Sequence, residues 1–275
     1  MEHLVQEHYA CPDLVEKIRA GLEKTGKTPE KISPKELGAV DQLHTGGAAA
    51  TLSIGERAGL KRGAAVLDAG CGIGGTSRVL AGHFGLAVSG IDLSYDFIDT
   101  AKILTQWCGM DQTCDISFRQ GSVLELPYET NSFDAIFCQH ILLNIKEKTI
   151  ALSEFSRVLK QGGKLILHEI VEGPGPAPIM PVPWANDSST SFIEPWEILE
   201  KELSDTGFSP TYFSDETQTN ADWWKKVNAI KKAKGTSPLN PGLVFGDNAR
   251  LFGPNMEQNF SAQAVRCIEA IFTIT

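Results

Sequence analysis

The chain has 275 residues, of which 42% are hydrophobic and 21% are charged, and its formal net charge is −9. This length supports one large α/β core with at most a modest appended cap. The acidic balance, and the lack of a basic cluster interleaved with aromatic residues, excludes nucleic acid as an expected partner. The chain begins without a basic and apolar leader and has no apolar run near the ~18 residues of a membrane span, so we expect a cytoplasmic protein with no membrane association.

From residue 64 onward, apolar runs and helical periodicity alternate in a βα rhythm. The pattern predicts strands over 64–68, 87–92, 116–119, 133–140, 164–170, 209–213 and 266–275. It predicts helices over 76–84, 95–107, 148–159, 195–206 and 221–233. Continuous apolar runs are typical of buried parallel strands. The predicted fold class is therefore α/β, with a Rossmann-like, mostly parallel sheet of seven strands and helices on both faces.

Two regions lie outside this rhythm. Residues 1–62 are polar and helical in pattern, and we predict that they form an N-terminal cap on a main domain over 63–275. Residues 171–192 contain five prolines, which disfavour a helix or a central strand and predict a lid inserted after the fifth strand. Residues 235–254 are rich in turn-forming residues, so we expect a loop there.

The most informative segment is the glycine-rich turn after the first predicted strand. Gly70, Gly72 and Gly75 fit the pattern G-x-G-x-x-G, which alone does not separate a nicotinamide enzyme from other nucleotide binders. Asp68, two residues before the first glycine, would repel a pyrophosphate but attract the ammonium and sulfonium groups of S-adenosylmethionine. Asp92 follows at the distance at which an acid reaches a ribose diol. These residues favour S-adenosylmethionine over NAD, with an NAD-dependent oxidoreductase as an alternative.

Several ordered segments resemble the successive motifs of class I S-adenosylmethionine-dependent methyltransferases. The resemblance covers about residues 40–215, and its segments are 66–75, 90–94, 121–122, 132–136 and 157–165. It implies a seven-stranded sheet whose last hairpin is antiparallel. Residues 41–47 and 181–185 are similar to the small-molecule subgroup related to sarcosine and dimethylglycine N-methyltransferases, within the methyltransferase type 11 family.

The resemblance also implies a cofactor site. By position, Asp68 and Gly70 would hold the methionyl end of the cofactor, Asp92 the ribose, and Gln139 the region beneath the sulfonium. Ser122 and Val123 would meet the adenine edge, although many relatives have an aspartate in place of Ser122. The remaining cofactor residues that we predict are Cys71, Gly72, Gly74 and Leu93.

Fewer sequence features indicate the residues that would bind and activate the methyl acceptor. His44 and His140 are the candidate catalytic residues, because a histidine can take or relay a proton near neutral pH, although either could instead be a structural histidine bonded to nearby backbone. Trp184 and His168 are candidate substrate-binding residues. The alternative for His168 is a buried, satisfied pair with Glu169 beneath the lid.

Methyl transfer is a direct displacement, so holding the two reactants in near-attack geometry matters more than any one acid–base residue. We therefore expect a methyltransferase that acts on a small acceptor, with an amine nitrogen as the first choice and S-adenosylhomocysteine as product. A non-catalytic S-adenosylmethionine sensor is the other alternative. We expect no bound metal, because the six cysteines are scattered without a C-x-x-C pair, and we regard a homodimer as compatible with the sequence.

Overall fold

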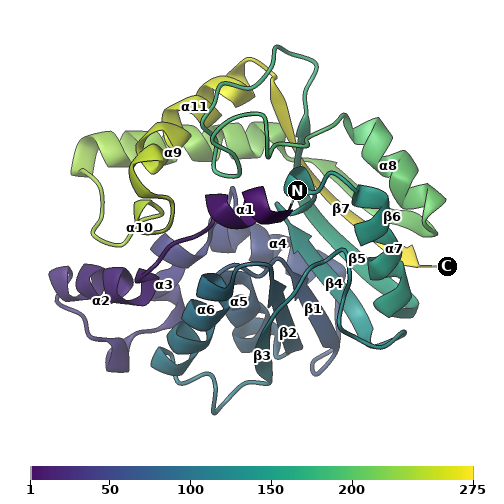
Figure 1. Ribbon diagram of the computed structural model, residues 1–275, viewed down its shortest axis with the longest axis horizontal. Helices are drawn as coiled ribbons and strands as arrows, with labels where there is room; N and C mark the ends of the chain where they lie inside the picture. Colours follow the sequence, from purple (N-terminus) through teal and green to yellow (C-terminus); the bar gives the residue numbers. More distant parts are fainter. Residues whose placement is uncertain (1, 275) are drawn as a thin grey trace.

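A seven-stranded sheet forms the centre of the structure, a computed structural model that describes residues 2–274 (Figure 1). The strand order is β3-β2-β1-β4-β5-β7-β6, and only β7 runs antiparallel to its neighbours. The strands are β1 Ala65–Ala69, β2 Ala87–Asp92, β3 Ile116–Gln120, β4 Phe133–Gln139, β5 Leu159–Glu172, β6 Phe208–Asp215 and β7 Val265–Ile274. The predicted fold class is confirmed.

Helices precede, connect and follow the strands. Before β1 lie α1 Glu2–His8, α2 Leu14–Lys24, the 3-10 turn η1 Pro29–Lys31, α3 Pro34–Asp41 and α4 Gly47–Ala58. Within the βα units lie α5 Gly75–Phe84, α6 Tyr95–Trp107, η2 Leu142–Asn144, α7 Lys148–Val158 and α8 Trp196–Asp205. Between β6 and β7 lie α9 Thr217–Lys234, α10 Gly242–Phe245, η3 Gly246–Asn248 and α11 Ala249–Ser261. The division into a cap over 1–62 and a main domain stays a prediction.

Alternation along the strands divides the core between the two faces of the sheet. Leu67 and Ala69 of β1 belong to the buried cluster that includes α7 and α8. Val66 points to the opposite face, where it packs with Ile54 of α4 and Leu80 of α5. Side chains alternate between the two faces because the strand is pleated. Helices therefore pack on both faces of the sheet (Figure 1).

The strand order reverses between β1 and β4, and this reversal fixes where a ligand can bind. β1 is followed on one side by β2 and β3 and on the other by β4 and β5. In open α/β sheets, ligands bind outside the carboxyl ends of the strands at such a switch point. The glycine turn follows β1 at this point, and α1 lies over it (Figure 1).

Two details of the predicted elements differ from the structure, and a third falls on a residue that the structure does not describe. Residues 235–254 are not a loop, because α10, η3 and the first half of α11 occupy part of them, with Pro254 inside α11. Pro254 cannot donate a backbone hydrogen bond within α11. The packing of Met256 and Phe260 in a buried cluster with residues of α9 and the lid offsets this loss. β5 extends to Glu172, so the predicted lid at 171–192 starts inside a strand. Thr275, predicted as the end of the last strand, lies outside the described residues.

Among the described residues, no helix combines the length and apolar character needed to cross a membrane.

Candidate functional site

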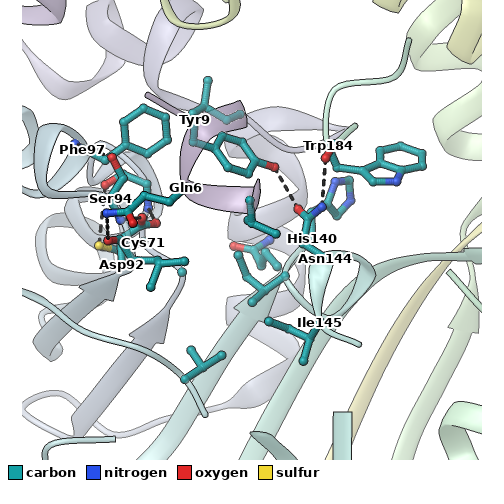
Figure 2. A pocket seen from close by; sticks show the side chains of 18 of the residues that line it. Gln6, Tyr9, Cys71, Asp92, Ser94, Phe97, His140, Asn144, Ile145 and Trp184 are labelled. Carbon is teal, nitrogen blue, oxygen red and sulfur yellow. Dashed lines mark hydrogen bonds between the residues drawn. The ribbon is translucent and has the colours of Figure 1, made fainter. Parts of the chain in front are cut away.

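A cavity lies at the carboxyl ends of β1, β2 and β4 and collects most of the predicted site residues. It is lined by the glycine turn, by α1, by the loops after β2, β3 and β4, and by the lid (Figure 2). The predicted residues that line it are His44, Asp68, Gly70, Cys71, Gly72, Asp92, Leu93, Ser122, Val123, Gln139, His140 and Trp184. Gly74 and His168 do not.

The glycine turn packs closely against its neighbours, which leave no room for a side chain at Gly70. Gly70 has a φ of 70°, and a Cβ added to it would lie 2.0 Å from Cδ1 of Ile141. The N–H groups of Gly70 and Cys71 both donate to the carbonyl of Ile91, at 2.8 and 2.9 Å. The turn therefore bends tightly against β2 and leaves open space on its cavity side.

Asp92 ties this turn to the next strand. One oxygen of its carboxylate accepts a hydrogen bond from Gly72 N and the other from Ser94 N, each at 2.9 Å. Burial raises the pKa of Asp92 to about 6. Because each carboxylate oxygen can accept more than one hydrogen bond, acceptor capacity remains for a ligand hydroxyl in the cavity.

Asp68 is more enclosed than the sequence suggests. It is 2% exposed, and Ser77 Oγ donates to its carboxylate at 2.5 Å. Burial raises the pKa of Asp68 to about 7, and the nearby charge of Asp92 acts in the same direction. The sequence argument uses the negative charge of this carboxylate, and a pKa near 7 means that the charge is only partly present in the cofactor-free protein at neutral pH.

The first helix contributes residues that sequence reasoning missed. Glu2 of α1 accepts a hydrogen bond from Ser122 Oγ, and Gln6 Nε2 donates to the carbonyl of Leu93 at 3.5 Å. Tyr9, just after α1, also lines the cavity. No motif signals these contacts, because they join residues more than 80 positions apart.

A buried ion pair fixes the segment before His44. Arg78 of α5 donates from Nη2 to Asp41 of α3 and to the carbonyl of Ile73 in the glycine turn, both at 2.8 Å. Arg78 and Asp41 are both buried, so removing either would leave an uncompensated charge. The pair therefore holds the chain around His44 against the turn.

A chain of hydrogen bonds connects His44 to Gln139. His44 Nε2 lies 2.9 Å from Thr51 Oγ1, and Thr51 Oγ1 donates to Gln139 Oε1 at 3.1 Å. Because the single hydroxyl proton of Thr51 is used on Gln139, His44 Nε2 must be the donor to Thr51. His44 Nδ1 is then the proton-free nitrogen, and it has no hydrogen-bond partner.

His140 adopts a backbone conformation that is rare for a histidine. Its φ is 57°, and its N–H donates to the carbonyl of His168 at 2.9 Å. Its Nε2 is buried and unpartnered. Burial lowers the pKa of His44 to about 4 and that of His168 to about 3, and lowers that of His140 as well. All three rings are therefore neutral at physiological pH.

The side chain of Asn144 connects the loop after β4 to the segment after α1 and to the lid. Its Oδ1 accepts from Tyr9 Oη at 3.0 Å, and its Nδ2 donates to the carbonyls of Trp184 and Thr190 at 2.9 and 2.7 Å (Figure 2). Trp184, the predicted lid residue, uses its indole N–H on Ser191 Oγ. The side chain of Asn144 thereby connects the segment after α1 to the lid.

Two predicted residues lie behind the cavity wall rather than on it. Gly74 has a φ of 84°, and an added Cβ would lie 2.8 Å from Arg78 Nη1, so its role is to let α5 begin there. His168 is fully buried, with Nδ1 3.4 Å from Gln139 Nε2 and Nε2 3.1 Å from Cys267 Sγ. Our prediction that His168 touches the substrate is corrected, because the satisfied, enclosed ring makes no part of the lining.

One group of side chains in the described part of the chain has metal-ligand geometry. The ligand atoms of His140, His168 and Cys267 lie within 4.8 Å of one another. His168 and Cys267 already satisfy each other by a hydrogen bond, and burial raises the pKa of the Cys267 thiol. The group is a protonated thiol beside neutral imidazoles.

The sequence from β1 to β5 matches a known family. Residues 67–167 match the family described as methyltransferase domain. Phosphoethanolamine N-methyltransferase 1 of Arabidopsis thaliana is 36% identical over 132 residues, which are 48% of this chain and 26% of that protein. The chain thus spans about a quarter of the length of such curated relatives.

Solved structures share the fold. Phosphoethanolamine N-methyltransferase 2 of Haemonchus contortus, in complex with phosphomonomethylethanolamine and S-adenosylhomocysteine, aligns with a TM-score of 0.68 at 24% identity, over 93% of this chain and 59% of that one. A protein from Galdieria sulphuraria described as a sarcosine dimethylglycine methyltransferase aligns with a TM-score of 0.65 at 20% identity, over 82% and 84%. The chain therefore shares its overall fold with these two solved structures.

Proposed function

We propose that this chain is an S-adenosylmethionine-dependent methyltransferase that transfers a methyl group to a small molecule, with an amine nitrogen as the acceptor atom. The observation that carries the proposal is the carboxylate of Asp92, which bridges the glycine turn and the start of α6 and keeps acceptor capacity toward the cavity. A methyltransferase domain over residues 67–167 supports the reaction type. Relatives named as N-methyltransferases support nitrogen as the acceptor atom.

The cofactor residues keep the roles that we predict from the sequence. Asp92 would accept hydrogen bonds from the ribose hydroxyls, and the open backbone of Gly70 and Gly72 would face the methionyl end. Asp68 would gain a positive partner in the cofactor's ammonium group, which offsets the cost of burying its charge. Ser122 is bonded to Glu2 and Leu124 N, so the adenine contact would fall mainly to backbone groups and Val123.

The chain's own residues position the acceptor and receive its proton. S-adenosylmethionine supplies an electrophilic methyl group on a positively charged sulfur. The nitrogen lone pair forms the new bond to carbon while the carbon–sulfur electrons return to sulfur. His44, through its proton-free Nδ1, and His140, through its unpartnered Nε2, are the proposed groups that take up the displaced proton. Tyr9 and Trp184 would close the cavity and exclude water.

The test is a calorimetric titration with S-adenosylhomocysteine followed by a screen of small amines, thiols, phenols and carbon acids. We expect saturable binding of S-adenosylhomocysteine, and its release from S-adenosylmethionine with at least one amine. Binding without turnover on any acceptor would favour a sensor protein. Failure to bind S-adenosylhomocysteine, together with reduction of NAD by a substrate of the screen, would favour an oxidoreductase.

A further inference from the structure

We propose that the acceptor is an uncharged amine with an apolar body and no phosphate group. This inference rests on the proposed function, and it concerns the end of the cavity beyond the glycine turn, between His44, His140, Ile145 and Trp184. It separates this chain from the solved neighbour that holds phosphomonomethylethanolamine. Three observations support it.

The first observation is the charge of the lining. Among the described residues that line the cavity, Lys146 is the sole lysine or arginine, whereas Glu2, Asp68 and Asp92 bring carboxylates that have no ion-pair partner; Asp41 is paired with Arg78. Lys146 is exposed and adjacent to Glu147, so solvent and its neighbour screen its charge. A phosphate group in a protein is usually held by arginine, lysine or free backbone N–H groups. Here a phosphate would meet a predominantly negative lining.

The second observation is the apolar wall at the acceptor end. Leu43, Ile141, Ile145, Pro183 and Phe245 line the cavity together with the two histidines. These side chains offer no hydrogen bonds to a charged group, and burying an unpaired charge against them would be costly. The polar atoms at this end that await a partner are the ring nitrogens His44 Nδ1 and His140 Nε2. Such a wall suits an apolar body with one polar atom.

The third observation concerns the acceptor's own proton. The pKa of His44 is lowered to about 4, and that of His140 is also lowered by burial and by the neighbouring rings. An alkylammonium ion has a pKa near that of lysine, about 10, so transfer of its proton to His44 would be unfavourable by about a millionfold. An aromatic amine arrives without that proton. After methylation its nitrogen is acidic enough to release a proton to a weakly basic imidazole.

The experiment compares two molecules that differ only in the phosphate: 4-aminobenzyl alcohol and 4-aminobenzyl phosphate. Each is titrated into the protein loaded with S-adenosylhomocysteine, and each is also tested for turnover with S-adenosylmethionine. We expect the alcohol to bind at least about tenfold more tightly than its phosphate ester. Equal or tighter binding of the ester, or saturable binding of phosphoethanolamine below about 1 mM, would overturn the inference.

A charge placed in the cavity sharpens the test. Ile145→Arg should tighten binding of 4-aminobenzyl phosphate at least about tenfold relative to the unchanged protein, because it adds the missing cation beside the acceptor end. Ile150→Arg adds the same charge at a site on α7 that is 48% exposed and outside the lining, and should produce no such gain. An equal gain in both variants would contradict the proposal.

The two levels of proposal fail in different ways. If S-adenosylhomocysteine does not bind, the proposed methyltransferase function is wrong, and the acceptor question falls with it. If S-adenosylhomocysteine binds and the phosphate ester is preferred, the function stands and only the inferred acceptor class is wrong. In that case Lys146→Gln would show whether the exposed lysine supplies the phosphate contact.

Discussion

The two ends of the cavity are built differently. The cofactor end consists mainly of backbone at the glycine turn and of carboxylates at the ends of β1 and β2, within residues 68–94, and Ser122, Val123 and Gln139 complete it. The acceptor end combines side chains from the N-terminal segment, the loop after β4, the lid and α10. The first end is therefore local in sequence and uses backbone geometry. The second depends on contacts between segments far apart in the chain.

This difference means that the cofactor end tolerates little change, whereas the acceptor end can vary with substrate. Gly70, whose φ is positive and whose added Cβ would overlap the Ile141 side chain, cannot be replaced without straining the backbone and displacing that side chain. A side chain such as Ile145 can change without altering the sheet, because it lies on a loop. The predictions below test this contrast.

The largest effect is expected from Gly70→Ala at the cofactor end. The new Cβ would lie 2.0 Å from Ile141 Cδ1 on a backbone with φ of 70°. We expect a loss of about 3 kcal/mol of stability and no measurable cofactor binding, as measured by thermal unfolding and calorimetry. Gly109→Ala, with a φ of 64° and nothing within 4 Å of the added Cβ, controls for the backbone strain alone. Equal destabilisation in both variants would mean that the close approach to Ile141 is unimportant.

The next effect is expected from Asp92→Ala, also at the cofactor end. The substitution removes the acceptor for Gly72 N and Ser94 N and the proposed ribose contact. We expect the dissociation constant for S-adenosylhomocysteine to rise about 10- to 100-fold, with the sheet still folded, because no core side chain is removed. Asp99→Ala, on the exposed side of α6, is the matched control. An unchanged dissociation constant would remove the main support for the proposed cofactor site.

At the acceptor end, His44→Gln should separate turnover from cofactor binding. The variant loses the proton-free Nδ1 but keeps an amide that can bond to Thr51. With an amine found in the acceptor screen, we expect kcat to fall about 10- to 100-fold while the dissociation constant for S-adenosylhomocysteine changes less than about twofold. His83→Gln, on the exposed face of α5, serves as the control. A parallel loss of cofactor affinity would show that His44 supports the glycine turn rather than the acceptor.

The sequence predicted most of the sheet and most of the residues that line the cavity around the glycine turn, because both follow from local patterns. The strand over 87–92 and the helix over 95–107 coincide with β2 and α6. The buried Arg78–Asp41 pair and the Tyr9–Asn144 bond were missed, because no local pattern pairs residues that are 37 and 135 positions apart. α11 was missed because its first half lies in the turn-rich segment 235–254, and tertiary burial of Met256 and Phe260 overrides that local signal.

The smallest predicted effect is on the pH dependence of stability, because burial shifts the pKa values of carboxyl groups and histidines in opposite directions. Burial raises the pKa of Asp68 to about 7 and of Asp92 to about 6 at the cofactor end. It lowers the pKa of His44 at the acceptor end to about 4 and that of His168, behind the cavity wall, to about 3. A raised carboxyl pKa means that the folded state binds more protons than the unfolded state, so stability falls as pH rises through that range. A lowered histidine pKa has the opposite effect, below the unfolded value of about 6.5.

Between about pH 4 and pH 6.5, the carboxyl groups and the histidines change the free energy of unfolding in opposite directions as pH rises. Above about pH 6.5, only the carboxyl groups still lower it. Glu169, with a pKa raised to about 8, and Glu269, with a pKa raised to about 7, act in the same direction as Asp68. We therefore expect the free energy of unfolding of the cofactor-free protein to decrease from about pH 6.5 to pH 8, as measured by urea denaturation. Asp68→Asn should make that decrease shallower, because the amide does not titrate. If Asp68→Asn leaves the slope of unfolding free energy against pH unaltered, the Asp68 carboxylate is already charged over this range. The opposite titration of the two ends of the cavity would then not involve Asp68.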